Sequence, residues 1–434
     1  PQPLREDAAD MSQTEPEYAS DPILEALRPE TTGNMLVTFR RGTDLARRQE
    51  IIALMVNPRL QERSAPMARF EIGETGEGLA PLDRSSPARL YRHLGAAVIR
   101  RAAGINMAAL SENLSHMDEV LDVRPEYYVY PLSATPTDTA GSTWGLKACN
   151  VTNSPFTGKG IKVAVLDTGL DRGHPDFQNN LGSIVAESFV DGEDADDIQG
   201  HGTHCAGTVG GPRQEGPAAV PGFGCAPHVD LHIGKVLSNR GFGTEESVIA
   251  GMDWALDEGC NIISMSLGIA VRRGESYQQN YEEIAAEALD LDTLVIAAAG
   301  NDSDRASGRI APVGSPANSP SIMAVGAIDA NYQPASFSNG GMNGNGGGID
   351  IVAPGVAVFS SAPRPMFYKV LSGTSMACPH VAGVAALWAE SDPQLRGRAL
   401  WNALVGHAKP IQGLPRDIGA ALVQAPSSSR TPVP

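Results

Sequence analysis

The chain has 434 residues, a formal net charge of −17 and 42% hydrophobic residues, which suggests a large domain accompanied by a smaller unit. The acidic balance and the lack of a basic stripe argue against nucleic acid as a partner, and no run of about eighteen apolar residues predicts a membrane span. The five cysteines show no CxxC spacing, which argues against a redox motif and a zinc ribbon.

The first third of the chain predicts a small α+β unit between two irregular stretches. Residues 1–33 are rich in Pro, Glu, Asp and Ser and predict a mobile tail. Residues 34–132 then alternate between strand and helix patterns. The predicted strands cover 35–39, 95–100 and 119–131, and the predicted helices cover 45–56 and 106–117. Residues 133–143 are rich in Pro, Thr, Ser and Gly and predict a linker.

The pattern changes over residues 144–425. Apolar strands alternate there with helices, and the strands are apolar on both faces. The predicted strands cover 160–169, 229–237, 261–268, 293–301 and 321–329, and the predicted helices cover 246–259, 281–292 and 394–405. This pattern is typical of an α/β domain with a mostly parallel sheet and helices on both faces. Residues 426–434 predict a disordered tail.

Three polar residues stand at the carboxyl ends of predicted strands. They are Asp167, Ser266 and Asn301. Because the carboxyl ends of parallel strands share one edge of the sheet, and sites in such sheets lie beyond that edge, we expect these residues on one rim.

A fourth candidate is Ser375, in the stretch GTSMACPHVAG over 373–383. Proline is tolerated in a helix only near its first turn, so Pro379 predicts a helix that begins close to Ser375. The hydroxyl then lies at a helix N-terminus, where free N–H groups favour negative charge. A lone serine in this position is more often only an N-cap, so other motifs must decide.

Acyl transfer needs a nucleophile, a base, an acid that orients the base, and donors for the oxyanion. The motif VAVLDTG contains Asp167, and the motif AAGN ends with Asn301. The motif HGTHCAGTV begins with His201 and predicts the start of a helix. These three motifs and GTSMA, in this order, resemble those of the subtilisin-like serine proteases (subtilases). The resemblance covers about 144–425, and residues 34–132 are similar in layout to the family's inhibitory propeptide.

The resemblance implies a role for each motif residue. Ser375 is expected as the nucleophile, His201 as the base and Asp167 as the residue that orients it. The Asn301 amide and the Ser375 backbone N–H are expected to form the oxyanion hole. The chemistry needs no cofactor.

The implied activity is that of a secreted serine endopeptidase made as a self-cleaving zymogen, with a maturation cut in the linker. Its expected partners are polypeptide substrates and its own propeptide, and a monomer is expected. Two alternatives stay open: a catalytically silent member used as a binding module, and a cytoplasmic maturation protease for one specific peptide.

The resemblance also predicts a substrate groove with an apolar pocket for the residue before the cut. The first edge of the groove, expected to pair with the substrate backbone as an added strand, comes from residues 241–243. The expected groove residues are Gly241, Phe242, Gly243, Ser266, Leu267, Gly268, Ala298, Ala299, Gly300 and Gly314. The pocket carries no acid that would select Lys or Arg, which implies a broad preference for apolar residues.

Structural calcium is a further expectation. By resemblance, Asp176 matches an acidic ligand position, but segment 210–224, which normally supplies further ligands, holds a single carboxylate. A second candidate is the carboxylate-rich segment 190–197, which suits a hard cation but is as often a solvated loop. Its proposed ligands are Asp191, Asp194 and Asp196.

The helix that opens at His201 also carries His204 and Cys205. Zinc on these three residues lacks an evident fourth ligand and would occupy the expected base. Residues four apart share a helix face, so the sequence instead predicts Cys205 as a buried residue one turn beneath the imidazole of His201.

Overall fold

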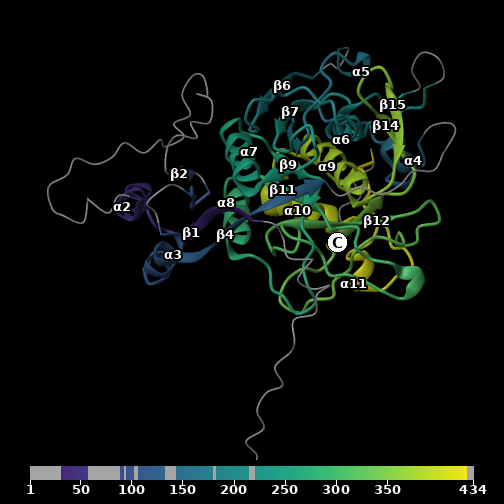
Figure 1. Ribbon diagram of the computed structural model, residues 1–434. Helices are drawn as coiled ribbons and strands as arrows, with labels where there is room; N and C mark the ends of the chain where they lie inside the picture. The colour runs from purple at the N-terminus through teal and green to yellow at the C-terminus, as the bar shows by residue number, and fades with distance from the viewer. Residues whose placement is uncertain are drawn as a thin grey trace, which may run out of the picture.

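The computed structural model describes residues 31–56, 88–91, 94–101, 106–131, 143–178, 182–214 and 220–427. Most of the predicted tail, the linker up to residue 142 and the last seven residues lie outside the described residues. A small unit, at the left of Figure 1, lies against a much larger one that holds the C-terminal two thirds of the chain.

The large unit is built on a seven-stranded sheet in the order β13-β12-β11-β9-β5-β7-β6, in which all neighbours are parallel. Its strands are β5 (Lys162–Asp167), β6 (Ile184–Ser188), β7 (Asp230–Lys235), β9 (Ile262–Met265), β11 (Leu294–Ala298), β12 (Met323–Ile328) and β13 (Ile351–Pro354). The predicted parallel sheet is confirmed. The two edge strands β6 and β13 were not predicted, because they are short and lack a long apolar run.

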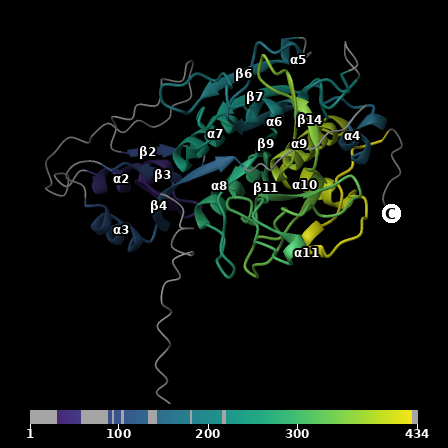
Figure 2. The ribbon, with the colours of Figure 1, turned by 45° about the vertical axis from the view of Figure 1, so that its right-hand side comes forward.

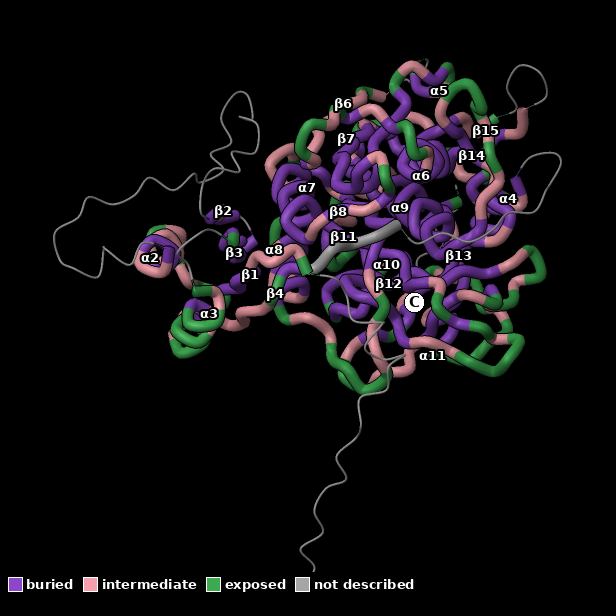
Figure 3. Tube along the Cα trace, viewed as in Figure 1, coloured by how far each residue is buried: buried purple, intermediate pink, exposed green. Residues whose placement is uncertain are grey.

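Helices cover both faces of this sheet. Helices α7 (Glu245–Asp257) and α8 (Gln279–Asp290) lie on the side of the small unit, whereas α6 (His201–Gly210) and α9 (Thr374–Ser391) lie beyond the central strands (Figure 2). Helix α9 begins one residue before Ser375, as Pro379 predicted, and is buried along most of its length (Figure 3). No helix in the described part of the chain is long and apolar enough to cross a membrane.

Helix α9 passes so close to its neighbours that Gly383 is needed inside it. A Cβ on that glycine would lie 2.5 Å from the Cβ of Cys225. The remaining elements of the large unit are α4 (Trp144–Ala148), η2 (Val151–Asn153), α5 (Pro175–Gln178), η4 (Arg305–Ser307), α10 (Gly397–Gly406), α11 (Pro415–Ile418) and the hairpin of β14 (Val358–Ser361) and β15 (Tyr368–Leu371).

The small unit is an antiparallel sheet in the order β4-β1-β3-β2, with two helices on its outer face. Its elements are β1 (Thr31–Phe39), α2 (Leu45–Val56), β2 (Ala88–Tyr91), β3 (Ala96–Ile99), α3 (Met107–Ser115) and β4 (Val120–Pro131). Strand β1 begins within the stretch predicted as tail, and β2 falls at the end of a polar segment with no strand pattern.

Successive side chains along the strands of this small sheet point to opposite faces, and both faces are apolar. Val37 and Ile99 pack with α2 and α3 in a separate small core. Leu36 and Val98, one residue away in each strand, belong instead to the continuous core of the large unit. The small unit is therefore docked through a buried sheet face.

Ion pairs at the N-terminus of α7 add to this docking. The Arg124 guanidinium donates two hydrogen bonds of 2.7 Å to the Glu245 carboxylate, whose side chain is fully buried. Arg100 pairs with Glu246 next to it, and both side chains are almost completely buried. Replacing either partner would leave an uncompensated charge in a site with little water.

Strand β4 continues beyond the small sheet into the large unit. There it pairs on one side with β8 (Gly243–Thr244) and on the other with β10 (Leu267–Gly268), both antiparallel. Val129 lies opposite Gly243, and Tyr130 lies opposite Gly268. One continuous backbone strand therefore fills the space between two edges of the large unit.

We predict that Arg124→Ala destabilises the docked small unit, because the buried Glu245 carboxylate loses its partner. Breaking one side of a buried pair costs about 3–5 kcal/mol. The measurement is calorimetric unfolding of the whole chain in a Ser375→Ala background, which removes the expected nucleophile. We expect a lower melting temperature for the small unit.

The control is Arg41→Ala. Arg41 pairs with Asp290 across the same boundary, but both side chains are largely exposed, and exposed pairs contribute little. Equal losses in the two variants would contradict the importance of the buried pair.

Candidate active site

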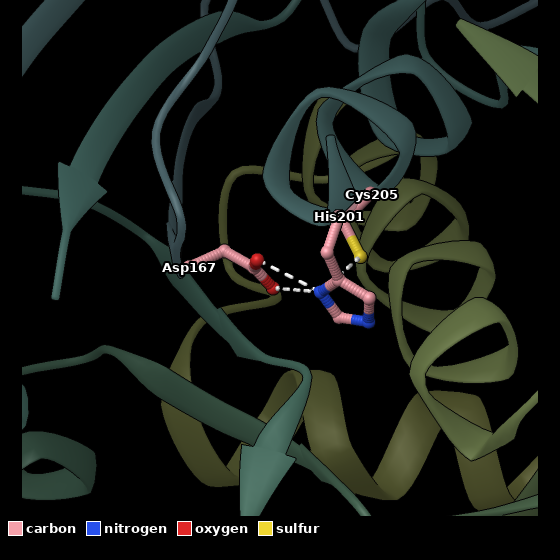
Figure 4. A group of neighbouring side chains, drawn as sticks. All are labelled: Asp167, His201 and Cys205. Carbon is pink, nitrogen blue, oxygen red and sulfur yellow. Dashed lines mark hydrogen bonds and ion pairs between the residues drawn. The ribbon is translucent and has the colours of Figure 1, made fainter. Parts of the chain in front are cut away.

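The centre of the site is a buried pair formed by Asp167 and His201. Asp167 is the last residue of β5, and His201 is the first residue of α6. The imidazole Nδ1 lies 2.8 and 2.9 Å from the two carboxylate oxygens (Figure 4). A proton held on Nδ1 by this carboxylate leaves Nε2 as an acceptor.

The surroundings of His201 act on its basicity in opposite directions. Burial lowers the pKa of the imidazole, but the charge and hydrogen bond of Asp167 outweigh this, and the net pKa of His201 is raised. The pair can therefore hold an extra proton on the ring when a neighbouring group releases one.

The start of α6 is held by Asp197, whose role the sequence analysis missed. The Asp197 carboxylate is buried and accepts hydrogen bonds from the backbone N–H groups of Gln199, Gly200 and Thr203, and from the hydroxyl of Thr168. From sequence, Asp197 is only the last carboxylate of the acidic segment 190–197. Its place four residues before the first residue of a helix was the available signal, because carboxylates commonly satisfy free N–H groups at helix starts.

Ser375 lies within reach of the same rim. Its hydroxyl donates a hydrogen bond of 3.3 Å to the carbonyl of Ser266, and the Ser266 hydroxyl donates one of 2.8 Å to the carbonyl of Ser375. Among the described residues, the buried Nε2 of His201 has no hydrogen-bond partner. The structure thus presents an unused acceptor in the site and a hydroxyl turned toward the end of β9.

Asn301 supplies a buried hydrogen-bond donor that, like the Nε2 acceptor of His201, has no partner in the described part of the chain. Its side-chain Oδ1 accepts hydrogen bonds of 2.9 and 3.1 Å from the backbone N–H and the hydroxyl of Thr374. Its Nδ2 is buried and has no partner among the described residues. The contacts of Oδ1 with the residue before Ser375 fix the orientation of the amide and leave Nδ2 as an unused donor.

The predicted groove residues fall into two groups, each with a strand that pairs with β4. Residues 266–268, 298–300 and Gly314 come together, since the Gly314 N–H donates to the carbonyl of Ala299 at 2.9 Å. A Cβ on Gly314 would lie 2.7 Å from the carbonyl oxygen of Ile269, so no side chain fits there. Segment 241–243 lies on the other side of β4 through its pairing with Val129.

The predicted position of Cys205 is confirmed. Its sulfur lies 3.9 Å from Nδ1 of His201 (Figure 4) and 3.5 Å from the carbonyl oxygen of Ser375. Burial raises the pKa of the Cys205 thiol, so the group is a neutral apolar neighbour of the imidazole. In the part of the chain that the structure describes, Asp167, His201 and Cys205 are the group whose potential ligand atoms lie within 4.8 Å of one another.

His204 points away from this group. Its Nε2 lies 3.1 Å from the carbonyl oxygen of Val358 and 3.2 Å from that of Lys369, and burial lowers its pKa to about 3. His204 therefore links α6 to the hairpin of β14 and β15.

Two of the candidate calcium ligands, Asp176 and Asp196, have protein partners. Asp176 accepts hydrogen bonds from the hydroxyls of Ser361 and Tyr368. Asp196 pairs with Arg172. The other two predicted ligands, Asp191 and Asp194, line a cavity of about 390 Å³.

Comparison with known proteins agrees with this geometry. Residues 158–421 match the Subtilase family. The chain is 38% identical over 260 residues to Subtilisin DY of Bacillus licheniformis, covering 60% of this chain and 87% of the relative. It is 38% identical over 291 residues to Subtilisin Savinase of Lederbergia lenta, covering 66% and 98%.

A longer match, 37% identical over 327 residues, is to Alkaline protease of Alkalihalobacillus alcalophilus, and it covers 74% of this chain and 79% of the relative. The Subtilase match includes Asp167, His201, Asn301 and Ser375 and extends over more than half of the sequence. The chain belongs to the subtilase family.

Proposed function

We propose that this subtilisin-like serine endopeptidase cuts peptide bonds with Ser375 as nucleophile, His201 as base and Asp167 as the residue that orients the base. The observation that supports this most strongly is that two of the buried atoms without a partner among the described residues, Nε2 of His201 and Nδ2 of Asn301, belong to the expected catalytic residues. Buried polar atoms are nearly always hydrogen-bonded. An unused acceptor and an unused donor in one site are what acyl transfer requires.

In the proposed reaction, the Ser375 hydroxyl turns from the Ser266 carbonyl toward Nε2 of His201 and attacks the substrate carbonyl carbon. The hydroxyl proton passes to Nε2, and Asp167 stabilises the imidazolium that forms. The negative oxygen accepts hydrogen bonds from Nδ2 of Asn301 and from the Ser375 N–H at the start of α9.

The imidazolium then gives its proton to the leaving amine, which departs and leaves an acyl group on Ser375. A water molecule, deprotonated by His201, releases this acyl group and restores the free hydroxyl. The catalytically silent alternative is disfavoured, because the chain retains every residue that these reaction steps need.

We infer that the small unit is an inhibitory propeptide. Strand β4 occupies the space between β8 and β10, where an extended substrate would add its own strand. The last residue of β4, Pro131, lies opposite Leu267, next to Ser266, whose carbonyl contacts Ser375. The docked small unit therefore blocks the groove, and a cut within 133–143 would turn it into a separate inhibitor.

We also propose a broad preference for apolar residues before the cut. The expected pocket has walls of small and apolar residues over 266–268 and 298–300, with Gly314 as its floor. None of these residues is charged.

Secretion, a monomeric state and a structural calcium ion remain proposals that rest on the resemblance to subtilases. The donor set argues against tight calcium binding at Asp176, because hydroxyl donors already bind both of its oxygens.

We predict that Ser375→Ala lowers turnover on an unstructured protein on the order of a millionfold, as removal of triad residues does in subtilisin. The fold should remain, since the lost hydroxyl makes only one weak hydrogen bond. Ser391→Ala is a matched control at the other end of α9, where the hydroxyl binds only the carbonyl of Trp388. Activity retained by Ser375→Ala, at unchanged far-UV circular dichroism, would refute the triad.

We predict that the active form begins within about 132–143. The measurement is the mass and N-terminal sequence of purified protein over time. The Ser375→Ala chain should stay whole on its own and be cut when wild-type enzyme is added. An active enzyme that is uncut, or that begins beyond Trp144, would contradict this maturation site.

We predict that the cleaved small unit stays bound more tightly at acid pH because of Glu126. Burial, assisted by the nearby Glu246 charge, raises the pKa of Glu126 to about 7, although hydrogen bonds from Thr32 and Asn34 oppose the shift. In the released unit this carboxyl is exposed, with a pKa of roughly 4.3. Docking therefore takes up a proton between these values, weakens as the pH rises toward 7, and changes no further above it through this group.

Gel filtration of the cleaved protein from pH 5 to pH 8 measures the bound fraction. Glu126→Gln is neutral at every pH and should make the bound fraction depend less on pH than it does in the wild type. The same pH dependence in both proteins would show that Glu126 does not carry the effect.

A further inference from the structure

A cavity of about 280 Å³ opens beside His201. Segment 198–201 forms one wall, and the β14–β15 hairpin with its loop 362–367 forms the other. None of the residues that pair with β4 lines this cavity. It is therefore distinct from the groove that β4 occupies.

The path of β4 indicates which part of a substrate would enter this cavity. Tyr130 lies opposite Gly268 and Pro131 lies opposite Leu267, so β4 advances toward Ser266 and Ser375. Residues before the cut therefore approach from the side of β10. Residues after the cut must continue beyond Ser375 on another path.

The proposed chemistry places that path next to His201. Nε2 of His201 must reach the nitrogen of the leaving segment to give it a proton. The cavity is lined by His201 itself and by Leu371, four residues before Ser375. The first residues of the leaving segment thus pass the mouth of this cavity.

The walls of the cavity include large apolar side chains that are exposed to solvent. Ile198 is 73% exposed and Met366 is 61% exposed, which places them among the few large hydrophobic side chains that the described surface leaves open. Exposed apolar side chains gathered at a hollow are typical of a binding surface. They can pack against the methylene groups of a substrate side chain.

Two basic residues line the same cavity, but only one has an available charge. The guanidinium of Arg364 makes a two-pronged ion pair with Asp171, with distances of 2.8 and 2.9 Å, which balances its charge. Lys369 is exposed, and its ammonium has no ion pair among the described residues. The cavity therefore presents one uncompensated positive charge above apolar walls.

We propose that this cavity receives the side chain of one of the first two residues after the cut, and that Lys369 makes the enzyme prefer glutamate there. The methylene groups of glutamate would contact Ile198 and Met366, and its carboxylate would meet the Lys369 ammonium. The inference rests on the proposed function, because it adds a substrate preference on the leaving side of the same site.

The test uses mature enzyme and quenched fluorescent peptides that differ at one position, which is Glu, Gln or Lys in the first or second place after the cut. We expect kcat/KM to be about two- to fivefold higher for Glu than for Gln at one of the two places, the size of effect that an exposed ion pair gives. The preference should shrink as salt is added.

Three variants separate charge from fold. Lys369→Met should abolish the preference for Glu while cleavage of the Gln peptide stays unchanged. Lys369→Glu should reverse the order, so that the Lys peptide is cut faster than the Glu peptide. Lys147→Met removes an exposed lysine of α4 that does not line the cavity, and it should behave as the wild type does.

The outcomes distinguish this proposal from the proposed function. If the wild type cuts none of the peptides, both are wrong. If the wild type cuts the Gln peptide but shows no preference for Glu at either place, or if Lys369→Met keeps that preference, the assignment of Lys369 is overturned and the triad stands.

Discussion

The buried contact between Asp167 and His201 is the constraint on which the site depends. A carboxylate taken out of water is costly unless hydrogen bonds replace its hydration. Here Asp167 accepts from the Thr168 N–H and from the imidazole. Asp197 fixes the helix that carries His201 to the loop after β5, through bonds to Thr168 and Thr203. The parallel sheet makes this possible, since it ends β5 at the same rim as β9 and β11.

The site also retains two buried polar atoms whose hydrogen-bonding capacity is unused. Nε2 of His201 and Nδ2 of Asn301 are buried without partners among the described residues, and each such atom costs roughly 1–3 kcal/mol. In each side chain the other polar atom is already engaged. Thr374 donates to Oδ1 of Asn301, and Asp167 holds Nδ1 of His201. The enzyme thus keeps donor and acceptor ready at some cost to stability.

Local patterns in the sequence were enough to predict the centre of the fold and the residues at its rim. Long apolar runs indicated β5, β9 and β11, and the polar residues that follow two of them, Ser266 and Asn301, were expected on one edge. The edge strands and β2 were missed, because a short strand that gains its stability from neighbours leaves little periodicity. Asp197 was missed because the density of carboxylates in its segment drew attention to a cation site instead of to the start of the following helix.

The pairing of β4 with β8 and β10 could not be predicted from local sequence patterns, for a different reason. These contacts join backbone groups more than a hundred residues apart, and backbone hydrogen bonds leave no mark on side-chain sequence. The resemblance to subtilases predicted an edge at 241–243 that accepts an added strand. It did not show that the chain's own β4 lies there.

The docked small unit contacts the large unit in two ways. Strand β4 contacts β8 and β10 through backbone pairing, which any extended peptide could imitate. Arg100 and Arg124 instead meet the carboxylates at the start of α7, and these contacts belong to this pair of surfaces alone. Both kinds are made by residues 31–131 of the described chain. On the proposed function, a cut in 133–143 leaves these contacts in place, so the small unit should stay docked until the buried charges at α7 are disturbed. The surface at the N-terminus of α7 would then determine when the groove becomes available to a substrate.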